Sequence, residues 1–251
     1  MRNIAYRPDL NKKTIQKLEK LKSELFLIQE KNYRKKFAAK KLKRIRQCRW
    51  FKNEIVVKLR EMSGSGNRCM YCSNSASSDV EHFYPKSAFP EKTFDWENML
   101  WICTSCNRKK GDEFPVNEQN SPLLIDPVSE NVWEFFFIDE FGMLSPVFDK
   151  SINKPNIRAK NTIETLGLNS EDRNYLCQNR RQAIKKLNEW VNRRIELLES
   201  KNKNRQQIIE ELKEEKNTFF RPDVVDYFFN GPGKKEEPFV TFFKKLDAFT
   251  S

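Results

Sequence analysis

Four cysteines form two Cys-x-x-Cys pairs in the first half of the chain, Cys69 with Cys72 and Cys103 with Cys106. Each pair folds into a tight turn that directs two thiolates to one point, and two such turns complete a tetrahedral Zn²⁺ site. A site of this kind leaves no open position for water or substrate. We therefore expect a structural zinc that stabilises a segment with little core of its own. A redox dithiol is a poor alternative, because two pairs occur and no thioredoxin-like pattern surrounds them.

The single histidine of the chain, His82, lies between these cysteine pairs and directly after Glu81. Because imidazole has an unperturbed pKa of about 6.5, neutral His82 can take a proton from water near physiological pH. Glu81 and Asn107 offer hard oxygen atoms of the kind that bind Mg²⁺ or Mn²⁺, and Asp79 is a further ligand or supports one. Hydrolysis of a phosphodiester needs an activated water, charge neutralisation on the phosphate and help for the departing oxygen, and a base together with a divalent metal supplies all three.

The geometry of a strand limits how these residues act together. Successive residues of a regular strand point to opposite faces, so Glu81 and His82 can serve one metal only at the end of the strand or at a bulge. Arg108 and Lys110 are candidates for holding phosphate oxygens, with Lys110 the better one. Plain solvated charge is the alternative for both.

Three short segments carry a resemblance to a known family: residues 79–87, 98–102 and 106–111. Together they resemble the HNH (ββα-metal) endonucleases. The resemblance implies a two-stranded ribbon and a helix around one divalent metal, with zinc bound by the cysteine pairs. It makes His82 the general base, Glu81 and Asn107 metal ligands, and Asn98 the residue that braces the loop. The last motif position is Asn107 rather than histidine, a variant that the family also uses and that makes for a weaker metal site.

A wider resemblance extends beyond this core to residues 122–127, the aromatic segment before Gly142, and residues 162–169. These segments look like the HNH subunit of Septu-type anti-phage systems, which also occurs with retrons. The resemblance implies a bacterial defence effector that works beside an ABC/SMC-like ATPase (PtuA-like), which would hold back or license its cutting. The long N-terminal and C-terminal helices are the places where we expect such a partner to bind.

The formal net charge of +12 is concentrated at the N-terminus, because residues 1–62 hold 20 Lys and Arg against 6 Asp and Glu. Residues 31–52 contain 11 basic residues and no acidic one. A block like this favours a polyanion, with DNA more likely than RNA, held through its phosphate backbone rather than its base edges. A solvated helical face and attachment to an acidic partner surface are the alternatives.

The hydrophobic pattern predicts a mostly helical α+β fold. We expect one or two long helices over residues 12–61, a break at 63–66, and an extended connection over 112–127. A strand over 132–138, a turn and a return strand over 143–147 follow. We then expect a short helix stopped by Gly167, helices over about 170–201 and 205–217, and a Phe-rich tail, some of whose rings are candidates for docking on a partner. The predicted parts are a basic helical arm (1–62), an HNH core (63–114), a linker with a β-hairpin (115–150) and a helical lobe (151–251).

Several function classes are excluded or disfavoured by the sequence. It contains no run of 18 apolar residues and no apolar secretory segment, so we expect a cytoplasmic protein without a membrane partner. Cys48 and Cys177 are expected to be packed thiols. A catalytically silent treble-clef zinc module, binding nucleic acid or protein, and an adaptor that only tethers an ATPase remain as alternatives. Glu81, His82 and Asn107 favour the nuclease, because neither alternative needs them.

Overall fold

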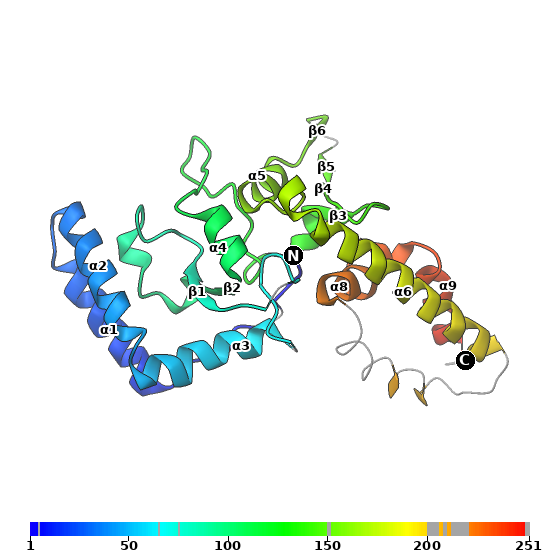
Figure 1. Ribbon diagram of the computed structural model, residues 1–251, viewed down its shortest axis with the longest axis horizontal. Coiled ribbons are helices and arrows are strands. Elements are labelled where there is room, and N and C mark those ends of the chain that lie inside the picture. The colour runs from blue at the N-terminus through cyan, green and yellow to red at the C-terminus, as the bar shows by residue number, and fades with distance from the viewer. Residues whose placement is uncertain are drawn as a thin grey trace. The chain divides into compact units, whose positions relative to one another are not determined.

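The computed structural model describes residues 1–4, 6–64, 66–74, 76–149, 152–199, 206–207, 210–211 and 221–248. It forms two compact units, whose elements are labelled in Figure 1. The unit called here the N-terminal unit consists of Ile4–Tyr71 and Ser75–Ser129, and the C-terminal unit of Met1–Asn3, Cys72–Asn74 and Glu130–Ser251. Most of the predicted arm and most of the predicted HNH core thus lie in one unit. The prediction of a mostly helical α+β fold is confirmed.

The arm of the N-terminal unit contains three helical stretches rather than the predicted one or two. They are α1 (Lys12–Phe26), α2 (Lys31–Ile45), and a π-helical turn η1 (Phe51–Val56) that continues into α3 (Val57–Ser63). The break after α1 has a side-chain cause, because Arg34 of α2 donates hydrogen bonds to the carbonyls of Phe26 and Ile28. These carbonyls lie at the end of α1, where helical partners are missing. The predicted break at residues 63–66 is confirmed, because α3 ends at Ser63 and its C-cap residue Gly64 has a φ of 74°.

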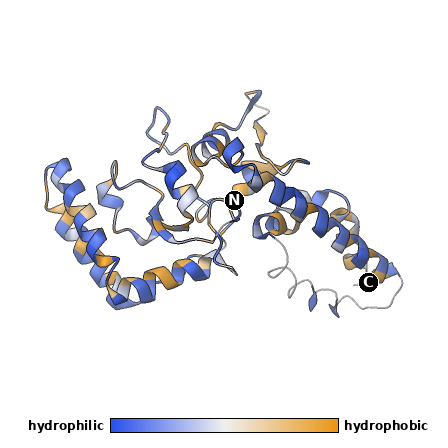
Figure 2. Cartoon of the chain, in the orientation of Figure 1, coloured by the Kyte–Doolittle hydropathy of each residue, from blue (hydrophilic) through white to orange (hydrophobic). Residues whose placement is uncertain are grey.

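The helices α1 and α2 lie side by side and bury a narrow apolar stripe (Figure 1). In α1 the buried apolar residues are Leu18, Leu21 and Leu25. Figure 2 shows α2 as a mostly hydrophilic helix, in keeping with its run of basic residues. Long cationic side chains therefore remain on the outside of the arm, while the apolar stripe holds its helices together.

A two-stranded ribbon and a short helix follow the arm. Strands β1 (Asp79–His82) and β2 (Met99–Ile102) pair antiparallel, with Glu81 opposite Leu100 and His82 opposite Met99. Helix α4 (Thr104–Lys110) starts directly after β2 and packs against β1. The connection from β1 to β2 contains only the 3₁₀ turns η2 (Pro90–Lys92) and η3 (Trp96–Asn98). This small ββα arrangement has the layout that the HNH resemblance implies.

The C-terminal unit begins with short strands. A 3₁₀ turn η4 (Val132–Glu134) precedes the hairpin of β3 (Phe136–Ile138) and β4 (Leu144–Pro146), and a second pair joins β5 (Phe148–Asp149) to β6 (Lys154–Pro155). The predicted strand over 132–138 is therefore right only for its last three residues. Its first residues turn because the Asn131 side chain accepts a hydrogen bond from Trp133 N.

Helices and 3₁₀ turns make up most of the rest of this unit within the described residues. They are α5 (Ile157–Leu166), α6 (Tyr175–Glu199), α8 (Pro222–Asn230) and α9 (Phe239–Ala248), with the 3₁₀ turns η5 (Glu171–Arg173) and η6 (Pro232–Lys235). The predicted stop at Gly167 is confirmed by its left-handed φ of 55°. The predicted helix over 205–217 lies almost wholly outside the described residues. The side chain of Phe249 lies wholly outside them. No helix in the described part of the chain is long and apolar enough to cross a membrane.

The core of the C-terminal unit combines aromatic rings with a buried charge cluster. Phe228 stacks on Phe239, and both are buried, so these two tail rings are core residues rather than docking residues. Asp223 is fully buried and accepts hydrogen bonds from Arg180 and Arg221. Burial alone would raise the pKa of Asp223, but the positive charges and hydrogen bonds of these arginines lower it well below its usual range. The cluster thus holds a carboxylate and two guanidinium groups in a low-dielectric interior.

Candidate functional site

The four paired cysteines come together as predicted. Their sulfur atoms all lie within 4.8 Å of one another and all four residues are buried. Four sulfurs in a tetrahedron around zinc, at a Zn–S distance of about 2.3 Å, are about 3.8 Å apart, so the cluster fits zinc. Cys103 Sγ also accepts a hydrogen bond from the backbone N of Cys106 and caps α4. The cluster therefore fixes the start of the helix that carries Asn107 and Lys110. Of the remaining thiols, Cys177 is buried and Cys48 is half-buried.

His82 is the last residue of β1 and is almost completely buried. Its Nε2 lies 2.8 Å from the carbonyl oxygen of Thr93, so Nε2 carries the proton and donates it to this carbonyl. Nδ1 is buried and has no hydrogen-bond partner among the described residues. The ring is thus held in one tautomer with the lone pair of Nδ1 available.

The protonation state of His82 follows from its surroundings. Burial is the main cause that lowers the pKa of His82 to about 3; the hydrogen bond to Thr93 opposes this shift, and the charges of Arg46, Lys86 and Lys110 add to it. The imidazole is therefore neutral near pH 7. A neutral imidazole with a free nitrogen is the form that a general base requires, although a pKa this low also makes the buried ring a weak base.

Glu81 precedes His82 but contacts a different element. Its Oε1 lies 3.4 Å from Nζ of Lys110 on α4, and both side chains are nearly or fully buried. Burial lowers the pKa of Lys110, and the charge of Glu81 opposes this shift. Lys110 is therefore not the solvated cation that the sequence alone left open, because its ammonium group is buried against the carboxylate. A buried pair of this kind fixes both side chains.

Asn98 joins the two ends of the connection between the strands. Its Oδ1 accepts a hydrogen bond from Tyr84 N (2.7 Å), and its Nδ2 donates to the carbonyls of Tyr84 (3.1 Å) and Lys92 (2.9 Å). Tyr84 follows His82 by two residues, and Lys92 precedes the Thr93 carbonyl that holds the His82 ring. The side chain thus makes the contacts that a loop-bracing residue would make.

The remaining predicted site residues are placed as follows. Asp79 is half-buried at the start of β1 and accepts a hydrogen bond from the Ser78 hydroxyl. Asn107 is half-buried on α4, and Arg108 is exposed. The cysteine cluster is the one group of three or more His, Cys, Asp or Glu ligand atoms gathered in the described part of the chain. Asp79, Glu81 and His82 do not form such a group, so the assignment of Glu81, Asn107 and Asp79 as ligands of a divalent metal stays a prediction.

Two further residues at this site were not singled out from the sequence. Thr93 contributes only its backbone carbonyl, for which the sequence has no signal. Arg46 donates a hydrogen bond from Nη2 to the carbonyl of Val80 in β1. In the sequence Arg46 belongs only to the basic block, because its contact with the strand depends on how the arm folds.

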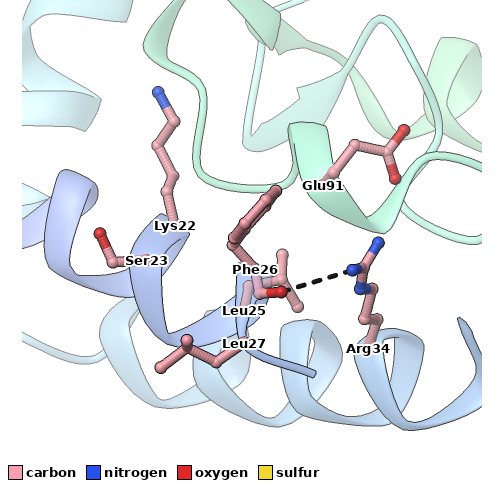
Figure 3. A pocket seen from close by; sticks show the side chains of 7 residues that line it. All are labelled: Lys22, Ser23, Leu25, Phe26, Leu27, Arg34 and Glu91. Carbon is pink, nitrogen blue, oxygen red and sulfur yellow. Dashed lines mark hydrogen bonds between the residues drawn. The ribbon is translucent and has the colours of Figure 1, made fainter. Parts of the chain in front are cut away.

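One pocket of the N-terminal unit borders the candidate site, and another does not. One, of about 380 Å³, is lined by Asn98 together with Tyr84, Lys92 and Arg7 among others, and therefore borders the braced connection. Another, of about 420 Å³, lies where α1 turns into α2 (Figure 3). Exposed Phe26 and Leu27 and the Arg34 side chain line it, and none of its lining residues is a predicted catalytic residue. The second pocket is therefore separate from the candidate site.

Comparison with known proteins agrees with this geometry. Residues 69–113 match the family described as HNH endonuclease. This segment of the chain is thus similar to an HNH domain. Over 160 residues the chain is 30% identical to the Septu protein PtuB of Bacillus thuringiensis, a match that covers 62% of this chain and 56% of that protein. The matched region thus spans little more than half of this relative's length. The resemblance to HNH endonucleases and to Septu subunits, predicted from the motifs, is confirmed.

Proposed function

We propose that the protein is a metal-dependent endonuclease that hydrolyses phosphodiester bonds through its HNH domain. The observation that carries the proposal is the buried, neutral His82 with its free Nδ1, placed next to Glu81 at the end of β1. The end of the strand is where the alternation of side chains allows consecutive residues to serve one reaction centre.

In the proposed reaction, His82 acts as the general base. Nδ1 takes a proton from a water molecule whose oxygen attacks the phosphorus atom, while the bond from phosphorus to the leaving oxygen breaks. The Thr93 carbonyl stabilises the imidazolium that forms, because it continues to accept the Nε2 proton. A Mg²⁺ or Mn²⁺ ion held by Glu81, Asn107 and Asp79 would neutralise charge on the phosphate and on the departing oxygen. Asn98 keeps the chain on both sides of His82 in place.

The substrate we propose is DNA in preference to RNA. Several lysines of α2, among them Lys35, Lys36 and Lys40, are exposed, and they belong to the same compact unit as the HNH residues. A row of exposed cations on one helix neutralises backbone phosphates without reading bases. We therefore assign the arm to substrate holding and expect little sequence preference from it.

The biological role we propose is defence against phages. The similarity to the Septu protein PtuB supports this role, and an ABC/SMC-like ATPase is the partner we propose on the same ground. Cutting would then depend on the state of that ATPase. The cytoplasm is the proposed location.

A second candidate function is a catalytically silent zinc module that binds nucleic acid or a protein. One observation favours it: the Glu81 carboxylate is already paired with the buried Lys110 ammonium, and His82 is almost inaccessible. Metal and water must enter this arrangement before the reaction can proceed. The two functions differ in whether cleavage occurs.

The test is a cleavage assay on supercoiled plasmid, single-stranded DNA and total RNA with Mg²⁺ or Mn²⁺. The wild-type chain and His82→Ala are compared, each alone and together with the proposed ATPase. Metal-dependent cutting that disappears in His82→Ala, with zinc content retained, is the expected result. Absence of cutting in every condition, with the fold and the zinc intact, would replace the nuclease by the silent module.

A further inference from the structure

Arg46 extends from the helical arm to the catalytic ribbon. It lies between α2 and η1, outside residues 69–113 that match the HNH family. Its Nη2 donates a hydrogen bond to the carbonyl oxygen of Val80, the residue before Glu81. Arg46 and Val80 belong to the same compact unit. A residue of the basic block is thus part of the structure around the candidate site.

The pairing of the strands shows which edge of β1 Arg46 reaches. In an antiparallel ladder, alternate residues exchange hydrogen bonds with the partner strand. Phe83 N donates to Asn98 O at 2.9 Å, in register with the pairing of Glu81 with Leu100. Glu81 is therefore in a hydrogen-bonded position, and the Val80 carbonyl points to the edge away from β2. Arg46 occupies an edge of the strand that β2 does not cover.

The charge of Arg46 lies close to the acidic residues of β1. Burial lowers the pKa of Arg46, and the charges of Glu81 and Asp79 oppose this shift. Its Nε is buried and has no hydrogen-bond partner among the described residues. The guanidinium group thus faces the strand rather than the solvent, unlike the exposed Arg44 and Arg49 on either side of it.

We propose that Arg46 is a positioning residue of the nuclease site. It holds the peptide between Val80 and Glu81 from the open edge of β1, which fixes the direction in which the Glu81 side chain leaves the strand. It also places a positive charge beside Glu81 and Asp79. This inference rests on the proposed function, and it makes the arm part of the catalytic unit as well as a surface for substrate.

The competing role for an arginine in a basic block is contact with substrate phosphate. Such a contact contributes to binding, so its loss raises KM. Loss of a residue that orients a metal ligand instead reduces activity or metal affinity, by about 10- to 100-fold in comparable cases. The two roles therefore predict different changes: a phosphate contact affects KM, whereas a positioning residue affects kcat or the metal requirement.

The experiment measures kcat, KM and the Mn²⁺ concentration for half-maximal rate on a DNA that the wild type cuts. We expect Arg46→Ala to lower kcat or raise the Mn²⁺ requirement by about 10- to 100-fold, with KM for DNA within about 3-fold of wild type. Arg46→Lys keeps the charge and one donor, and should recover part of the loss. Arg44→Ala, the matched substitution of an exposed arginine in the block, should raise KM. Arg181→Ala, an exposed arginine of α6, controls for loss of an arginine elsewhere.

The outcomes are distinguishable. If Arg46→Ala keeps the wild-type kcat and Mn²⁺ requirement, or changes only KM as Arg44→Ala does, Arg46 is not a positioning residue. If Arg46→Ala and Arg46→Lys both lose their zinc, Arg46 is a folding residue, and the proposal is equally overturned. A wild-type chain that cuts no substrate, with or without the ATPase, contradicts the proposed function itself.

Discussion

Replacing Asn98 by alanine tests how the connection between the strands supports His82. The substitution removes one hydrogen bond to Tyr84 N and two to the carbonyls of Tyr84 and Lys92. Asn98 is buried, so water does not readily replace these partners. Tyr84 flanks His82 on one side, and Lys92 adjoins the Thr93 carbonyl that orients the imidazole. We therefore expect the geometry of the base to loosen together with the loop.

The size of the effect follows from the number of bonds. A neutral hydrogen bond contributes about 1 kcal/mol net, so three of them contribute about 3 kcal/mol to holding the connection in its catalytic arrangement. Since about 1.4 kcal/mol corresponds to a tenfold change in rate, we expect kcat to fall by about two orders of magnitude. Asn98→Asp should recover little of this, because a carboxylate still accepts from Tyr84 N but repels both carbonyl oxygens.

The assay measures kcat and KM at saturating metal, with zinc content and thermal unfolding as checks on the fold. The matched control is Asn117→Ala, which removes an asparagine that also braces a loop by accepting hydrogen bonds from Gln119 N and Ser121 N. Asn117 is exposed and contacts no predicted site residue in those bonds. A kcat within threefold of wild type for folded Asn98→Ala, or an equal loss in Asn117→Ala, would refute the reasoning.

Two further predictions concern stability. Removing zinc with a chelator, or substituting Cys106→Ser, should unfold the segment around α4 and abolish cleavage, because a structural zinc site contributes on the order of 10 kcal/mol to folding. Metal analysis measures the zinc content, and near-UV circular dichroism measures the loss of native structure. A native spectrum in a protein without zinc would contradict the prediction. Because the pKa of Asp223 is lowered in the folded state, the ionised carboxylate stabilises the folded protein. This contribution to the free energy of unfolding is complete above about pH 4 and is lost as the pH falls below that value. Asp223→Asn should cost about 3–5 kcal/mol at pH 7 and flatten this acid dependence in urea unfolding from pH 7 to 3; unchanged acid dependence would contradict it.

The parts of the fold that the sequence predicted are those with strong local signals. Paired cysteines imply a metal cluster because each pair already sets two sulfurs in one turn. Gly64 and Gly167 end their helices through positive φ angles, which glycine adopts freely. In these places the chemistry of a few adjacent residues decides the structure.

The parts that it missed depend on residues distant in the sequence. The apolar pattern continues through Leu27 and Ile28, so it gives no sign that α1 ends at Phe26. The end is stabilised by the side chain of Arg34 from the next helix. In the same way, lysine is a residue type usually found at the surface, and only the ion pair with Glu81 explains why the Lys110 side chain is buried. A periodic pattern records burial but not the partner of a charged group.

The candidate site shows the same division at the level of single atoms. The sequence predicts that His82 is the base, but either ring nitrogen can serve until one of them is occupied. The carbonyl of Thr93 occupies Nε2 and so assigns the base to Nδ1. A second carbonyl, that of Val80, joins Arg46 to the strand that carries Glu81. Every residue type has such a carbonyl, so composition and spacing cannot reveal which one acts. The proposed reactive atom and its orientation are therefore properties of the folded backbone, although the sequence already predicts the residue that carries it.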